Sequence, residues 1–144
     1  MDPKRLVTDC APICIALALS DLSFNIMLPI AGMGMLPLIS RIARWGILFA
    51  SGFFAIKRTA ADIMALGAAS SAASFLIYLA SALIILSGIG GMDIAAASEA
   101  LAGSALFGGG SPISALVAIV SALIFLALEG ALLSGFGSFF RSRL

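Results

Sequence analysis

Three stretches of this sequence, residues 10–39, 61–89 and 113–140, are long, apolar and nearly free of charge. A helix needs about 20 apolar residues to cross the ~30 Å hydrocarbon core of a bilayer. Only 10% of the residues are charged, whereas a soluble domain has about 25%. The sequence therefore predicts an all-α fold, a single polytopic helical bundle in a membrane, with three or alternatively four transmembrane helices.

The first stretch is too long for one straight helix, because its 30 residues would extend for about 45 Å. Pro29 lacks a backbone N–H and glycines follow it, so we expect a kink near Pro29. Residues 45–56 form a shorter apolar segment, whose length is typical of an interfacial helix. A fourth span here would place Arg41 and Arg44 deep in the bilayer, at a cost of about 2.5–3.5 kcal/mol each.

The start of the second stretch carries a helix-capping pattern. Thr59 is followed three residues later by Asp62, which resembles a capping box with Asp in the usual place of Glu. We expect this helix to begin close to Thr59.

The distribution of basic residues predicts the topology. Positive charges favour the cytoplasmic side, and residues 92–112 contain none. We expect residues 41–58 and the C-terminus to be cytoplasmic and the 92–112 loop to be extracytoplasmic. The residues expected to set topology and contact lipid headgroups are Arg41, Arg44, Lys57, Arg58, Arg141 and Arg143. Three spans would place the N-terminus outside, although Lys4 and Arg5 favour inside.

Small residues form a stripe along one face of the second span. With spacings of 4 and 3, the stripe contains Gly67, Ser71, Ser74, Tyr78, Ser81, Ile85 and Gly88. Such a stripe allows two helix backbones to approach closely in a membrane. The last span presents Ala118 and Ala122 on the same face as Glu129. We expect both faces to be helix-packing seams, either within the chain or between chains.

Asp21, Asn25 and Glu129 are polar residues within the apolar stretches. Carboxylates inside a membrane are costly and are candidates for a function. One interpretation is that Asp21 and Glu129 bind an ion or proton alternately. A second is that they are structural, either protonated or paired with Arg41 or Arg44 of a neighbour or with a basic residue of a partner subunit. A third is that one of them lies at the membrane interface.

Composition argues against several classes of function. The sequence has no histidine, which excludes His-ligated zinc and histidine-dependent catalytic triads. We expect no enzymatic activity, no cofactor and no metal site. The net charge of +1, without a basic run, predicts no direct binding of nucleic acid.

Three functions remain for a chain with so little mass outside the membrane. The first is a non-enzymatic subunit of a homo-oligomeric or hetero-oligomeric membrane assembly, in contact with lipids and with its own copies or other subunits. The second is a small ion-coupled or proton-coupled transporter or channel using Asp21 and Glu129. The third is a hydrophobic helical subunit that polymerises, pilin-like or similar to a viral membrane subunit. Only in this polymer would contact with nucleic acid be expected.

Overall fold

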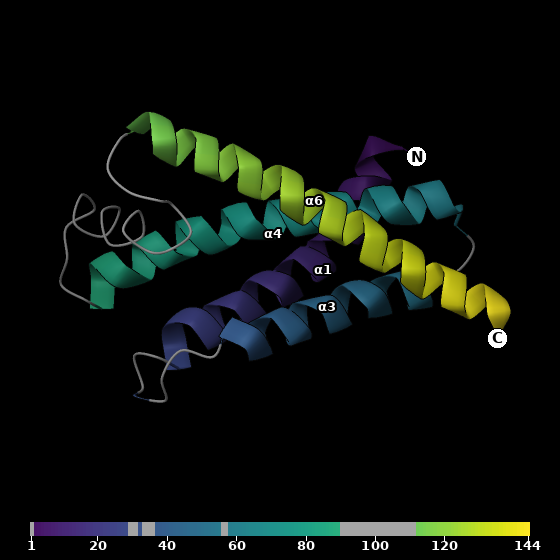
Figure 1. Cartoon of the computed structure of the whole chain (residues 1–144), viewed down its shortest axis with the longest axis horizontal. Coiled ribbons are helices and arrows are strands. Elements are labelled where there is room, and N and C mark those ends of the chain that lie inside the picture. The colour runs from purple at the N-terminus through teal and green to yellow at the C-terminus, as the bar shows by residue number, and fades with distance from the viewer. Residues whose placement is uncertain (1, 29–31, 33–36, 56–57, 90–111) are drawn as a thin grey trace.

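The computed structural model describes residues 2–28, 32, 37–55, 58–89 and 112–144, and these are arranged as a bundle of helices. In chain order the elements are α1 (Pro3–Leu22), the π-helical segment η1 (Ser23–Met27), α3 (Pro37–Phe54), α4 (Ala60–Ile89) and α6 (Pro112–Arg143). The long helices alternate in direction along the chain (Figure 1). The two termini, the end of α3 and the start of α4 therefore lie at one end of the bundle.

The predicted fold class, an all-helical bundle with membrane-spanning helices, is confirmed. Three helical segments, Pro3–Met27, Ala60–Ile85 and Leu116–Arg143, are long and apolar enough to cross a membrane. Helix α3 has 18 residues, a length of about 27 Å, and it contains two arginines. It packs most extensively on α6 and also on α1 and α4, so it forms part of the bundle.

The boundaries of the first half differ from the sequence prediction. Within the predicted span 10–39, the described residues are helical to Leu28, and α3 begins at Pro37. The kink expected near Pro29 lies outside the described residues. The segment predicted at 45–56 begins at Pro37, where proline is well suited to the first turn of a helix. Most of the expected 41–58 loop is therefore helix α3.

Two helix starts follow the local sequence. The Asp2 side chain accepts a hydrogen bond from the Lys4 backbone N–H at 3.1 Å. At the start of α4, the Asp62 N–H donates to Thr59 Oγ1 at 3.2 Å, and the Thr59 hydroxyl donates to the Asp62 carboxylate at 2.8 Å. The predicted pairing of Thr59 and Asp62 at this helix start is confirmed.

Glycines allow α6 to lie directly on α4. A Cβ atom at Gly67 would overlap the backbone of Gly130, and one at Gly130 would overlap the backbone of Gly67. The same is true where α6 meets α3, because a Cβ at Gly52 would overlap the Ser134 backbone. The positions of these glycines therefore fix where α6 crosses the bundle.

The bundle is polar in several interior positions and apolar outside. Four serines, Ser70, Ser71, Ser74 and Ser134, are fully buried. Large apolar side chains are exposed on every long helix, and those of α6 are Leu116, Val117, Val120, Ile124, Phe125, Leu128, Leu132, Phe136, Phe139 and Phe140. Water would disfavour this distribution, whereas lipid matches it. The described helices are therefore compatible with a small membrane protein.

Thiols contribute to the contact between α1 and α4. Cys10 and Cys14 are buried and unbridged, and their Sγ atoms donate to the carbonyls of Leu66 at 3.8 Å and Ser70 at 3.5 Å. Both cysteines act here as small packing residues.

Candidate functional site: charged groups within the bundle

An ion pair lies inside the bundle between α1 and α3. Arg44 Nη1 donates to Asp21 Oδ2 at 2.6 Å, and the side chains of Arg44 and Asp21 are 6% and 13% exposed. A buried charge is costly unless it is paired and hydrogen-bonded. The pairing therefore makes it feasible for α3 to carry an arginine between apolar helices.

The other side of the Arg44 guanidinium contacts α4. Its Nη2 donates to Ser71 Oγ at 2.7 Å, to the Ser71 carbonyl at 3.0 Å and to Ser74 Oγ at 3.3 Å. Ser74 in turn donates to the Ser71 carbonyl at 2.8 Å. One arginine thus connects three helices, because it binds the carboxylate of α1 from α3 and two serines of α4.

Asn25 and Ser40 extend this polar cluster. Ser40 Oγ donates to Asp21 Oδ1 at 3.2 Å, and Asn25 Nδ2 donates to Ser40 Oγ at 3.2 Å. Asn25 belongs to η1, where the helix widens, and π-helical turns are often found at functional positions. We call Asp21, Asn25, Ser40, Arg44, Ser71 and Ser74 the inner polar cluster.

A second carboxylate lies on the outer side of α3. The Trp45 indole N–H donates to Glu129 of α6, and Trp45 is 44% exposed. Glu129 is half-buried and lies 12 residues before Arg141 in α6, about 18 Å along the helix. Arg41, one turn before Trp45 on the same face of α3, is exposed. We call Arg41, Trp45 and Glu129 the outer polar patch.

The small-residue stripe of α4 packs within the chain over part of its length. Gly67, Ser71, Ser74 and Tyr78 are buried. Tyr78 belongs to an apolar cluster that Ala118 and Ala122 of α6 pack against. Farther along the stripe, Ser81 is half-buried and Gly88 is exposed, and no described atom lies within 4 Å of a Cβ placed at Gly88. The first part of the seam, from Gly67 to Tyr78, is therefore occupied by the chain's own helices.

The predicted headgroup residues have different surroundings. The prediction that Arg44 contacts a headgroup is wrong, because Arg44 is buried in the inner polar cluster. Arg58 forms an ion pair with Asp9. Arg141 Nη1 donates to the Ala55 carbonyl at 2.6 Å. Arg143 lies 5.1 Å from the centre of the Phe139 ring, and Lys57 lies outside the described residues.

Sequence reasoning found both intramembrane carboxylates but not their partners. Pairing of a carboxylate with Arg44 was one of several alternatives, and Trp45 carried no signal for a hydrogen bond to Glu129. Ser40 and Ser134 looked like ordinary small residues. An arginine inside an 18-residue apolar helix was the signal that a countercharge must lie nearby.

The polar groups of the inner cluster bind one another, so they can hold helices at fixed positions.

A comparison of this chain with protein-family models found no match, and comparisons with curated proteins and with solved structures found none either. Function is therefore inferred from the geometry of the inner polar cluster and the outer polar patch.

Proposed function

We propose that this chain is a non-enzymatic subunit of a membrane assembly, and that its outer polar patch is the contact with another subunit. The observation that carries the proposal is the presence of polar groups on the outside of the bundle, with Glu129 near the middle of α6. Arg41 is exposed and Glu129 is half-buried, while Trp45 supplies a hydrogen bond to Glu129. Lipid chains offer no partner to such groups, whereas a second protein surface does.

A second copy of the chain is the partner that this patch fits best. A two-fold contact places the same surface patch of both subunits together, so the patch must be complementary to itself. The outer polar patch holds one cation, Arg41, and one anion, Glu129. In a two-fold dimer, Arg41 of each subunit would face Glu129 of its partner.

The small-residue seam is not the contact in this proposal. Gly67 and Ser71 are already in contact with α6 of the same chain, so their close packing stabilises the subunit itself. The contact between subunits would instead involve the exposed sides of α3 and α6.

A charge exchange tests the proposed contact. Arg41→Glu and Glu129→Arg should each reduce dimer formation in lipid nanodiscs, because each places like charges together. The double variant should restore the dimer, and Arg143→Glu should leave it unchanged as a control for charge at the bundle end. Native mass spectrometry gives the oligomer distribution, and circular dichroism checks that each variant is helical.

Several outcomes would overturn this contact. A wild-type protein that is strictly monomeric in nanodiscs contradicts it. An open-ended series of masses favours the polymerising subunit, and a dimer that resists both single charge changes places the contact elsewhere.

Proton-coupled or ion-coupled transport is the second candidate. The observation in its favour is that adjacent residues of α3, Arg44 and Trp45, bind the two carboxylates Asp21 and Glu129. A shift of α3 would change both contacts together. In reconstituted vesicles, Glu129→Gln should then abolish flux while the protein remains assembled. A wild-type protein without flux under proton or sodium gradients contradicts this candidate.

The proposed orientation places the basic end of the bundle in the cytoplasm. Lys4, Arg5, Arg58, Arg141 and Arg143 lie toward this end, where α1 begins, α4 begins and α6 ends. In a background without Cys10 and Cys14, Thr59→Cys and Ser142→Cys should be inaccessible to an impermeant reagent added outside. Ser98→Cys should be labelled, and the reverse pattern would invert the orientation.

A further inference from the structure

The basic end of the bundle contains an open hollow of about 380 Å³ lined by Lys4, Arg5, Thr8, Asp9 and Arg58. Four of these residues come from the first turns of α1, and Arg58 lies two residues before the start of α4. Pockets for small ligands have volumes of about 300–1,000 Å³. The hollow is therefore large enough to accept a compact charged group.

The chemistry of the lining favours an anion. Three of the lining side chains are cationic and one is anionic, and that anion, Asp9, is paired with Arg58. The Thr8 hydroxyl donates to the Lys4 carbonyl at 2.9 Å. Lys4 and Arg5 are exposed. Ammonium and guanidinium groups form strong, charge-assisted hydrogen bonds with phosphate oxygens.

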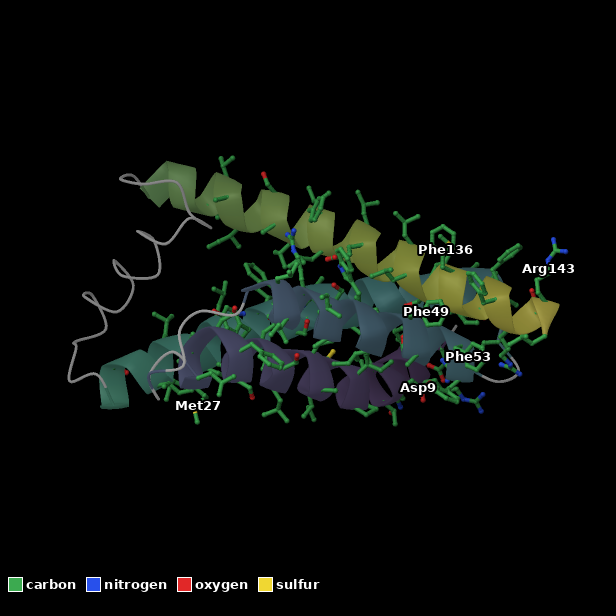
Figure 2. The ribbon with its side chains drawn as sticks, turned by 60° about the horizontal axis from the view of Figure 1, so that its bottom comes forward. Asp9, Met27, Phe49, Phe53, Phe136 and Arg143 are labelled. Carbon is green, nitrogen blue, oxygen red and sulfur yellow. The ribbon has the colours of Figure 1, made fainter. Side chains whose placement is uncertain are left out.

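An exposed apolar side chain lies beside the charged hollow, and this combination favours a lipid over a soluble anion. Val7, between the lining residues Arg5 and Thr8 in the sequence, is 69% exposed. Asp9 lies toward the same end of the bundle as Arg143, opposite Met27 (Figure 2). A phospholipid has the matching shape, with a charged headgroup at the end of apolar chains.

We propose that this hollow binds the headgroup phosphate of an acidic phospholipid, with Lys4, Arg5 and Arg58 as the cationic partners and the apolar surface beside Val7 in contact with an acyl chain. Acidic lipids are enriched in the cytoplasmic leaflet, where the positive-inside rule places a basic end. The site is independent of the outer polar patch, so it does not require the proposed dimer.

Native mass spectrometry of the full chain in detergent provides the test. The protein is titrated with phosphatidylglycerol or with phosphatidylcholine of the same chain length, and the bound lipid is measured. Phosphatidylglycerol should bind more tightly than phosphatidylcholine. A basic residue near an anionic lipid surface contributes about fivefold in affinity, so the double variant Lys4→Gln, Arg5→Gln should lose about 25-fold.

Arg143→Gln is the matched control, because it removes a charge from the same end without touching the hollow. It should retain the wild-type affinity for phosphatidylglycerol, and all variants should have the wild-type circular dichroism spectrum. Equal binding of both lipids, or an equal loss for Arg143→Gln, would overturn the site. Saturable binding of inorganic phosphate that displaces the lipid would show a site for a free anion instead.

Discussion

Arg44 and Trp45 are adjacent in α3, yet they bind two carboxylates in opposite surroundings. Arg44 is 5% exposed and makes hydrogen bonds to Asp21 on one side and to serines of α4 on the other. Trp45 is 44% exposed and makes a single hydrogen bond to Glu129. Both carboxylates belong to long apolar helices, but within the described part of the chain an ion pair is found for Asp21 and not for Glu129.

The comparison shows that a charged residue in an apolar helix can serve two different purposes. The inner polar cluster is surrounded by the chain's own helices, so its contribution is to the stability of the subunit. The outer polar patch retains an exposed cation and a half-buried carboxylate, and we propose that its further partners come from a second subunit.

Removing the inner cation should have the largest effect. Arg44→Met leaves the Asp21 carboxylate buried without its partner, and breaking a buried ion pair in this way costs about 3–5 kcal/mol. Thermal or denaturant unfolding in detergent measures the loss. The double variant Asp21→Leu, Arg44→Met should recover a large part of the stability, and wild-type stability of the single variant would contradict the structural role.

A bulky residue at the closest helix approach should have the next largest effect. Gly67→Leu places a side chain where the backbone of α6 lies, and overpacking of this kind costs about 1–3 kcal/mol or more. Gly88→Leu is the matched control, because this glycine lies in open space on the same stripe, and it should change stability by less than about 0.5 kcal/mol. Equal effects in unfolding experiments would contradict the difference between the two ends of the stripe.

The outer carboxylate should tolerate an amide better than an apolar side chain. Glu129→Gln keeps an acceptor for the Trp45 indole, whereas Glu129→Leu removes it and leaves polar groups unpaired, at about 1–3 kcal/mol. The loss should appear in the dissociation of the oligomer in nanodiscs. If Glu129→Leu instead reduced the stability of the isolated subunit more than that of the oligomer, Glu129 would have a structural role within the subunit, as Asp21 does.

Trp45→Phe should have the smallest effect on the subunit. It keeps the ring and removes one hydrogen-bond donor, so the stability should fall by about 0.5–1.5 kcal/mol. Arg44→Met, measured under the same unfolding conditions, is the reference, because Arg44 and Trp45 are adjacent in the same helix. A Trp45→Phe loss as large as that of Arg44→Met would remove the distinction between the inner and outer contacts.

Several features could be read from the sequence because they depend on local chemistry. The apolar stretches predicted the membrane helices, and the capping pattern of Thr59 and Asp62 is present at the start of α4. The spacing of Gly67, Ser71 and Ser74 predicted a face for close packing. Asp21 and Glu129 were identified because a carboxylate in an apolar segment is unusual by itself.

The separate helix α3 was harder to predict, because its stability depends on contacts far away in the sequence. Arg44 makes a span through this segment appear costly, and the proximity of Asp21, Ser71 and Ser74 offsets part of that cost. The same applies to Trp45, whose neighbour Glu129 is 84 residues away. No periodicity within α3 indicates either partner.

The sequence by itself determined that this chain is helical and suited to a membrane, because hydropathy and helix length act within each segment. The tertiary structure decided which polar groups are inside. Glycines at the crossing of α4 and α6 set the closest approach of these helices, and the cluster around Arg44 joins α1, α3 and α4. Burial and pairing of a charge depend on the positions of several helices at once, and these positions are not a property of any one of them.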